Sequence, residues 1–322
     1  MSELATAVFA AQSGAHLLDA PRTARFAAFL RGFDEASYRD DLARRGVRWI
    51  PRGDSAFPSR LRSIHDPPPG VFDWRSAVLY FVFVDRFVNG NGANDCHVAG
   101  ASVSGTASGD YEGGDWAGVT QKIDAGYFDD LGVNTLWVTV PVKNADQDAY
   151  PGTGGDTHVY SAYHGYWPYD PSSTETCFGT LAELQTLVSE AHKHSLKVLF
   201  DFAMVHVTID SPVYQNNPGW FWPNSWNNGD CICGQNCDWN AQAYRCWFAS
   251  YLPHWNYTVQ AARDYSVGTA VNLAKTTGAD GFRLDAIKHV DSSWLLELRQ
   301  QIQSTIVPLQ NPQQRFYMVG ET

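Results

Sequence analysis

From residue 73 onward, the sequence predicts an α/β fold in which parallel strands alternate with helices. Three observations support this prediction. Short apolar runs alternate with longer segments whose apolar residues recur every three or four positions, as on one face of a helix. The runs are continuously apolar, which is typical of parallel strands covered on both faces. Polar residues stand at the ends of the runs, where the loops of a strand–helix unit begin.

The elements follow one another in a regular order. The first strand is wholly apolar, and the second stops at Pro141, which cannot continue a central strand. Helical spacing separates the later strands, as in Leu184, Leu187, Val188 and Ala191. The predicted strands are 78–84, 135–140, 197–202, 281–285 and 316–321, and the predicted helices are 117–131, 179–194, 260–276 and 291–306. Residues 203–259, rich in Trp, Asn and Cys, are predicted to be an insertion after the third strand.

The composition narrows the class of protein. A chain of 322 residues corresponds to two average domains or one large barrel-type unit. Its 44% hydrophobic and 18% charged residues exclude disorder as the main state, and no apolar run reaches the roughly 18 residues of a membrane helix. A net charge of −11 argues against a general nucleic-acid binder. The 12 Trp, 15 Tyr and 17 Phe fit either sugar stacking or a large core.

A change in composition divides the chain near residue 72. Residues 1–72 hold ten Arg and eight acidic residues, for a net charge of +2. Residues 73–322 hold thirteen basic and twenty-six acidic residues, for −13, and all six Cys. The change falls beside the run Pro67-Pro68-Pro69-Gly70, which cannot continue a helix. We therefore predict a separate helical segment at 1–72.

The segment around residues 53–69 resembles the N-terminal region of the DNA-processing A (DprA-like) family. The similar stretch runs from Gly53-Asp54 through Phe57-Pro58 and Leu61 to Asp66-Pro67-Pro68. It stops where that family's DNA-contacting domain begins, so the resemblance implies no DNA-binding residue here. The alternative is a generic helical cap with a proline-rich linker.

Polar residues gather where the predicted strands end: Asp85, Asp201 with His206, Arg283 with Asp285, and Glu321. In a (β/α)8 barrel, catalytic groups lie at the carboxyl ends of the strands. A charge within an apolar strand is costly unless it is paired or used. One such residue fits a structural role as well as a functional one, whereas a set in register favours a functional site.

Several of these stretches resemble the conserved regions of the α-amylase family, glycoside hydrolase family 13. The similar segments are Gly132–Trp137, His164–Trp167 with Asp170, Asp201–His206, Gly281–His289 and Val319–Glu321. The resemblance covers about residues 73–322 and implies a (β/α)8 barrel, at 73–202 and 260–322, with domain B inserted at 203–259. The implied reaction is retaining cleavage of α-1,4-glucosidic bonds in starch or maltooligosaccharides, and the implied partner is an α-glucan.

The resemblance also assigns catalytic roles. Asp285 would be the nucleophile and Glu321 the acid/base, and a retaining glycosidase needs two carboxyl groups about 5 Å apart. Arg283 lies two residues before Asp285 and so points to the same strand face. We expect its charge to keep Asp285 ionised by lowering its pKa, and we expect the acid to need a raised pKa.

Substrate contacts are implied for seven further residues. His164 and His206 would hydrogen-bond sugar hydroxyls, Tyr166 would stack on the cleaved unit, and Lys288 and His289 would line the leaving-group side. Trp167 and Asp201 complete the substrate-binding set, which is His164, Tyr166, Trp167, Asp201, His206, Lys288 and His289. The alternative for each histidine is a satisfied core or surface imidazole.

An Asn- and Gly-rich stretch resembles a calcium loop found in part of the same family. Clustered side-chain and backbone oxygens suit a hard cation. The candidate Ca2+ ligands are Asn89, Asn91, Asn94, Asp95, the Gly113 carbonyl and Asp115. The alternative is an Asn-Gly turn without a metal. Val205 stands where a second calcium site of the family has Asn, so we expect no second site.

The six cysteines favour disulfides over zinc. Cys231, Cys233, Cys237 and Cys246 lie in the insertion, and their spacing does not fit paired C-x2-C ligands. The pairing cannot be deduced from the sequence. Disulfides indicate an oxidising compartment, and the amylase-like part resembles secreted enzymes. Residues 2–20 nevertheless lack a secretory signal, so the chain as written is expected in the cytoplasm.

The sequence ends at Thr322, directly after Glu321. The resemblance therefore implies a barrel truncated after the third conserved region, without strands six to eight or the fourth region. We expect such a chain to be a fusion of a DNA-processing fragment with a partial amylase, with little or no starch turnover of its own. The alternative is a non-catalytic carbohydrate-binding or DNA-processing-related protein. No membrane partner is expected, and the sequence does not fix an oligomeric state.

Overall fold

The computed structural model describes residues 70–322 apart from 102–108, 153–155, 157 and 310–313. The chain divides into Met1–His65 and Asp66–Thr322, and the description below concerns the second of these units. The predicted helical segment and its DprA-like stretch lie outside the described residues.

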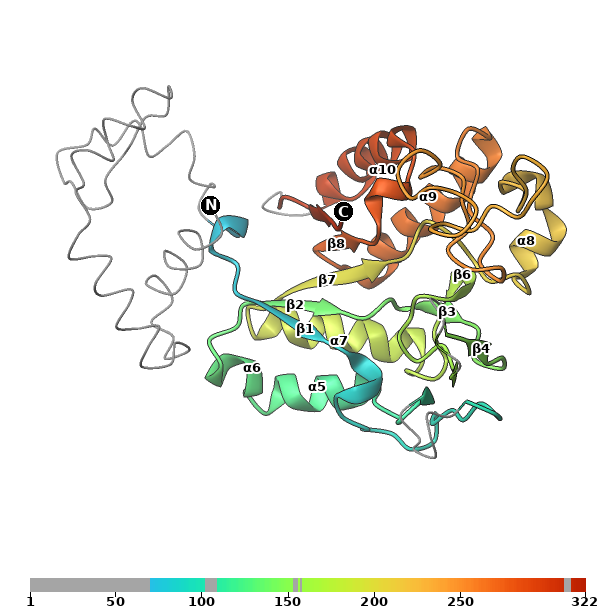
Figure 1. Cartoon of the computed structure of the whole chain (residues 1–322). Coiled ribbons are helices and arrows are strands. Elements are labelled where there is room, and N and C mark those ends of the chain that lie inside the picture. Colours follow the sequence, from blue (N-terminus) through green and yellow to red (C-terminus); the bar gives the residue numbers. More distant parts are fainter. Residues whose placement is uncertain (1–69, 102–108, 153–155, 157, 310–313) are drawn as a thin grey trace, which may run out of the picture. The chain divides into compact units, whose positions relative to one another are not determined.

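A five-stranded parallel sheet forms the centre of the unit (Figure 1). Its strands pair in the order in which they occur along the chain, β1-β2-β7-β8-β9, and every pair is parallel. This is the order expected for consecutive strand–helix–strand units. The strands are β1 (Leu79–Val82), β2 (Thr135–Val138), β7 (Lys197–Phe202), β8 (Gly281–Leu284) and β9 (Tyr317–Gly320).

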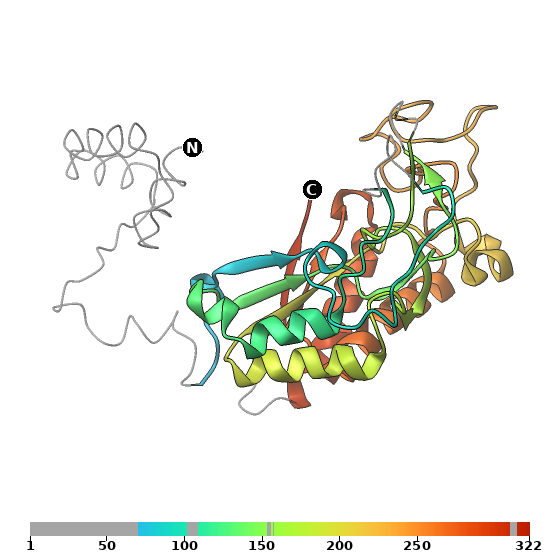
Figure 2. The same ribbon diagram turned by 90° about the horizontal axis from the view of Figure 1, so that it is seen from below.

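Helices follow the strands and pack on one side of the sheet (Figure 2). Asp115 caps the first of them, and Thr180 and Glu183 form a reciprocal capping box at another. The predicted helix 117–131 is wrong in one respect, because Gly126 at φ +75° breaks it into two. The helices are α5 (Trp116–Asp124), α6 (Tyr127–Asp130), α7 (Leu181–Lys193), α9 (Gln260–Thr277) and α10 (Ser292–Thr305).

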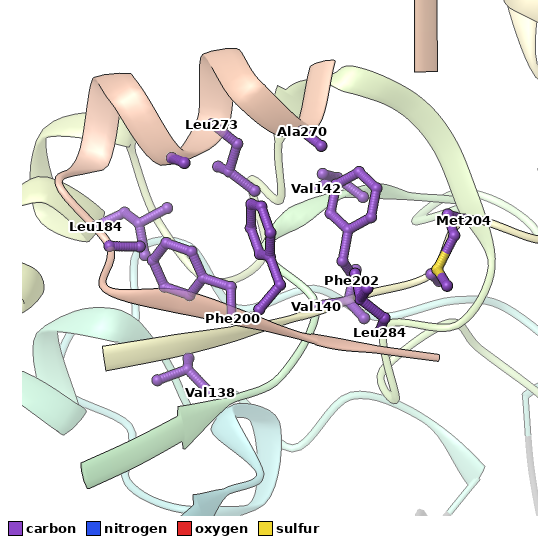
Figure 3. Packing of buried hydrophobic residues seen from close by; sticks show 14 of the residues in the cluster. Val138, Val140, Val142, Leu184, Phe200, Phe202, Met204, Ala270, Leu273 and Leu284 are labelled. Atoms are coloured by element: carbon purple, nitrogen blue, oxygen red, sulfur yellow. The ribbon is translucent and has the colours of Figure 1, made fainter. Parts of the chain in front are cut away.

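The core lies between the sheet and these helices. Figure 3 shows Val138, Phe200 and Phe202 of the sheet against Leu184 of α7 and Leu273 of α9. Phe200 and Leu184 are fully buried, and β7 and β8 are the most deeply buried strands. Burying side chains of this size stabilises the fold by about 1.5–3 kcal/mol each.

The opposite face of the sheet is lined by different side chains. Alternate residues, including Trp137 and Leu199, point to this side and border a hollow of about 310 Å3. Leu79, Phe81 and Val319 are 43%, 37% and 38% exposed. The expectation of cover on both faces is therefore wrong for the outer strands β1 and β9, whereas β7 and β8 are buried on both faces. In a (β/α)8 barrel this face points to the interior, which explains why the strands are apolar on both sides.

The segments between the main elements hold further short structure. The predicted first strand is shorter than expected, because its end forms a 3-10 helix, Val84–Arg86. Two antiparallel pairs between β2 and α7 were not predicted: β3 (Val142–Asn144) with β6 (Pro168–Thr174), and β4 (Tyr150–Pro151) with β5 (Val159–Tyr160). The remaining elements are α8 (Pro212–Asn216) and 3-10 turns at Trp74–Ser76, Pro218–Trp220, Ile287–His289 and Val307–Leu309.

The cysteines form three disulfides: Cys96–Cys177, Cys231–Cys237 and Cys233–Cys246. The last two interlock within the insertion. None of the helices in the described residues combines the length and apolar character that crossing a bilayer requires.

Candidate active site

The strand-end residues converge because parallel strands present their carboxyl ends at one edge of the sheet. Asp201 lies on β7 directly beside Arg283 on β8. Asp285 follows β8, and Glu321 follows β9, the next strand in the sheet. The predicted nucleophile, acid/base and arginine therefore lie on neighbouring strand ends.

Arg283 binds all three carboxylates. Its Nη1 lies 2.8 Å from Asp201 Oδ1 and 2.8 Å from Asp285 Oδ1, and its Nη2 lies 2.6 Å from Glu321 Oε2. The Asp201 side chain is fully buried, whereas that of Glu321 is 55% exposed. The carboxylates raise the pKa of Arg283, so the guanidinium stays charged and holds Asp285 and Glu321 side by side.

The electrostatics at Asp285 differ from the sequence-based expectation. Burial and the neighbouring Asp201 carboxylate raise the pKa of Asp285 to about 7, and Glu321 adds to the rise. Arg283 acts in the expected direction but does not outweigh them. The prediction of a lowered pKa is therefore wrong, because it considered the cation two residues away but neither the burial of Asp285 nor the two carboxylates that share the cation.

Tyr166 connects the carboxylates to the two histidines. Its hydroxyl donates to Asp201 Oδ2 at 2.6 Å, and its backbone N–H donates to His164 Nδ1 at 2.9 Å. His206 Nε2 lies 2.9 Å from the Tyr166 carbonyl and therefore carries the proton. Burial lowers the pKa of His164 to about 3 and that of His206 to about 4, so both imidazoles are neutral. His206 Nδ1 is buried and has no hydrogen-bond partner among the described residues.

A cavity of about 630 Å3 opens beside these groups. Six predicted site residues line it: Tyr166, Trp167, His206, Arg283, Asp285 and Glu321. Asp201 and His164 are not among the lining residues, and each contacts Tyr166 from outside the cavity.

Lys288 and His289 lie elsewhere. Lys288 is exposed, and His289 is buried with its Nδ1 at 2.9 Å from the Ala243 carbonyl. Neither lines the cavity within the described part of the chain. Both belong to the 3-10 turn that follows Asp285, and that turn directs them toward the insertion.

The second wall of the cavity comes from the insertion and was not predicted residue by residue. It consists of Cys233, Gly234, Gln235, Trp239, Phe248 and Leu252. The richness of residues 203–259 in Trp and Cys was the available signal. It could not identify which aromatic ring faces the strand ends.

The calcium candidates separate into two groups. Asn89 Nδ2 lies 2.8 Å from Asp95 Oδ1, and a Cβ at Gly113 would lie 2.7 Å from Asn89 Nδ2 and 2.8 Å from Asp95 Oδ1. These three residues therefore surround one small space, into which Asp95 presents a carboxylate oxygen and Asn89 its amide Nδ2. With its amide turned over, Asn89 would present an oxygen, and carboxylate and amide oxygens suit Ca2+.

The other three calcium candidates contact other groups in and around the loop. Asp115 accepts from the N–H groups of Gly90, Asn91 and Gly118, as expected of a helix cap. Asn91 Oδ1 accepts from the Ala93 N–H, and Asn94 lies beside Asn91 and Gly179. The structure therefore brings Asn89, Asp95 and Gly113 together and gives Asp115, Asn91 and Asn94 other partners.

Comparison with known proteins gives consistent matches. The family model described as "Alpha amylase, catalytic domain" matches residues 81–318. A cyclomaltodextrin glucanotransferase of Bacillus licheniformis is 35% identical over 237 residues, which are 67% of this chain and 31% of that protein. An α-amylase of Niallia circulans is 33% identical over 239 residues, which are 67% of this chain and 42% of that protein.

Solved structures give the same result. The α-amylase from Geobacillus thermoleovorans complexed with acarbose is 31% identical, with a TM-score of 0.58 over 77% of this chain and 47% of that one. An Anoxybacillus α-amylase is 29% identical, with a TM-score of 0.61 over 78% of this chain and 48% of that one. The chain spans about a third of the length of the cyclomaltodextrin glucanotransferases that it matches.

Proposed function

This chain belongs to the α-amylase family, whose catalytic domain is a (β/α)8 barrel, and on that premise we propose that its site cleaves α-1,4-glucosidic bonds of starch-type glucans with retention of configuration. The observation that supports the proposal most directly is the placement of Asp285 and Glu321. They lie on two nitrogens of one guanidinium, beside a cavity large enough for several sugar atoms.

In the first step, the Asp285 carboxylate attacks the anomeric carbon. The bond from that carbon to the glycosidic oxygen breaks as Glu321 transfers its proton to the leaving oxygen. In the second step, Glu321 removes a proton from water, the resulting hydroxide attacks the same carbon, and the bond to Asp285 breaks. The sugar then leaves with its original configuration, and both carboxyl groups return to their starting states.

The neighbouring residues position the substrate. The Tyr166 ring, fixed by its hydroxyl on Asp201, stacks against the cleaved unit, and His206 lines the cavity beside it. Arg283 holds the nucleophile in place by a direct ion pair. Lys288 and His289, which the family resemblance places at the leaving-group side, do not line the cavity among the described residues and are not assigned a substrate contact.

A second candidate, binding of an α-glucan without cleavage, is favoured by the position of Glu321. Its Oε2 lies 2.6 Å from Arg283 Nη2, so the proposed acid is held in an ion pair with the arginine. Cleavage requires Glu321 to leave the pair when the substrate arrives.

The experiment that separates the two candidates uses two substrates. Maltoheptaose needs a proton on its leaving oxygen, whereas α-maltosyl fluoride releases fluoride without one. Under the cleavage proposal, the unmodified chain releases the α-anomer first, as followed by NMR. Asp285→Asn abolishes turnover of both substrates. Glu321→Gln abolishes turnover of maltoheptaose but still releases a burst of about one fluoride per chain from α-maltosyl fluoride, because only the first step can proceed without Glu321. Release of the β-anomer would overturn the retaining mechanism, and maltoheptaose binding with no turnover would establish the second candidate.

We also propose that Asn89, Asp95 and the Gly113 carbonyl hold Ca2+. The space that a Cβ at Gly113 would fill supports this proposal, as does the Asp95 carboxylate beside it. Asn89 would turn its amide oxygen toward the ion in place of the Nδ2 that donates to Asp95. The ion would fix the loop after β1 and takes no part in the bond cleavage.

A further inference from the structure

The insertion carries a loop that two disulfides tie to itself. We call residues 231–246 the cystine loop. Cys231–Cys237 and Cys233–Cys246 interlock, and the four cysteines are buried together against Phe248. Cys233 N–H also donates to the Trp247 carbonyl, and Trp247 N–H donates to the Cys231 carbonyl. The loop is thus held by covalent bonds and backbone pairing instead of by a large core of its own.

Trp239 stands on this loop with its ring partly free. The residue is 43% exposed, yet it lines the same cavity as Asp285 and Glu321. Its ring centroid lies 5.5 Å from that of Phe248 and 5.2 Å from that of His289. Contacts of this kind fix the ring orientation and leave part of its surface to the cavity.

Gly234 makes the position of the Trp239 ring possible. A Cβ at Gly234 would collide with Trp239 Nε1, and the residue has φ +75°, which only glycine adopts without strain. Any other residue at this position would displace the ring. Glycine at position 234 therefore leaves the room in the cystine loop that the Trp239 ring occupies.

His289 connects the cystine loop to the catalytic strand. Its Nδ1 donates to the Ala243 carbonyl at 2.9 Å, and its own carbonyl lies 3.0 Å from His254 Nε2. His254 Nδ1 lies 2.7 Å from the Cys246 carbonyl. Because His289 is four residues after Asp285, the cystine loop is attached directly behind the proposed nucleophile.

We propose that Trp239 is a stacking platform for a glucosyl unit of the bound α-glucan, and that the cystine loop and His289 position it against the catalytic carboxylates. The inference rests on the proposed function and extends it, since it assigns substrate recognition to a residue outside the conserved stretches. The flat, partly exposed ring complements the apolar face of a pyranose, and Gln235 beside it in the wall offers an amide for the hydroxyls. Trp239 contacts the substrate, whereas His289 is a positioning residue that acts through Trp239.

The test measures maltoheptaose affinity by calorimetry in the Asp285→Asn protein, which cannot consume the ligand under the proposed mechanism. Adding Trp239→Ala is expected to raise Kd about tenfold, and Trp239→Phe is expected to restore most of the affinity. Gly234→Ala keeps the tryptophan but displaces it, so it is expected to raise Kd as well. The matched control is Trp226→Ala, which removes a ring of the same insertion that is 40% exposed and does not line the cavity. It is expected to leave Kd unchanged.

The outcomes separate this inference from the proposed function. If the Asp285→Asn protein binds no maltoheptaose, both proposals fail. If it binds and Trp239→Ala leaves Kd unchanged, or if Trp226→Ala has the same effect as Trp239→Ala, only the stacking role fails. Thermal unfolding of each variant accompanies the measurement. A weakened Kd with an unchanged Tm supports the stacking role, and a weakened Kd that follows a lowered Tm in both Trp239 variants contradicts it.

Discussion

The sheet and the insertion contribute to one cavity but are stabilised in different ways. Strands β7 and β8 are buried along almost their whole length and pack against α7 and α9. Within the described residues, the insertion has only α8, one 3-10 turn and isolated bridges as regular structure, and two disulfides hold it. The sheet supplies the charged groups, and the insertion supplies an aromatic wall. The groups proposed for the reaction are therefore held by the packed core of the sheet, whereas those proposed for substrate recognition are held by disulfides.

The largest effect is expected from the sheet core. Phe282 on β8 is fully buried and packs against Phe202 and Phe316. Phe282→Ala is expected to lower the free energy of unfolding by about 3–5 kcal/mol, because it leaves a cavity in a close-packed site. Urea unfolding checks the value. Phe248→Ala, which removes a partly exposed ring of the insertion, is the comparison and should cost less. Equal costs would show that the insertion packs as tightly as the sheet.

Removing a disulfide of the cystine loop is expected to lower stability by a smaller amount, and mainly within the loop. Replacing Cys233 and Cys246 by Ala removes a bridge between residues 13 positions apart. The chain-entropy argument gives a loss of about 3 kcal/mol for a loop of this size. Hydrogen exchange should show faster exchange in 231–246 and unchanged protection in β7 and β8. Equal loss of protection in both would mean that the insertion and the sheet unfold as one unit.

These contrasts also explain how far the sequence could be interpreted. Strand β7 was predicted with its observed bounds, because a buried parallel strand is a continuous apolar run. Parallel order then requires Asp201, Arg283, Asp285 and Glu321 to meet at one edge, as the structure shows. The remaining features depend on three-dimensional packing. A period of apolar residues does not encode the cysteine pairing, the break at Gly126, the burial of His289 or the direction in which Trp239 faces.

The raised pKa of Asp285 is another property that the apolar pattern does not encode. It predicts that kcat/KM changes about tenfold per pH unit on the acidic side. Because its pKa is raised to about 7, the carboxylate needed for attack is lost as the pH falls below 7. The kcat/KM for maltoheptaose should therefore fall about tenfold for each pH unit below that value. The groups facing Asp285 are Asp201, Glu321 and Arg283. Asp201→Asn removes one of the neighbouring charges, so it should move the acidic limb to lower pH. A limb near pH 4 in the unmodified chain would contradict the prediction.

The smallest effect on stability is expected from Ca2+ at the loop after β1. This loop follows a strand of the sheet, so it belongs with the sheet and not with the insertion. If Ca2+ binds between Asn89, Asp95 and Gly113, saturating calcium should add about 1 kcal/mol and raise Tm by about 2–4 °C, and a chelator should reverse the gain. Gly113→Ala fills the space with a Cβ and adds strain at φ +84°, so its own Tm falls. The informative quantity is therefore the increment that calcium adds, which should vanish in Gly113→Ala and persist in Asn91→Ala. An increment that survives in Gly113→Ala would place the ion elsewhere. The Cys96–Cys177 bridge and hydrogen bonds such as those of Asp115 would then hold the loop without an ion, and the sheet side, like the insertion, would rely on a covalent bond for the order of its loops.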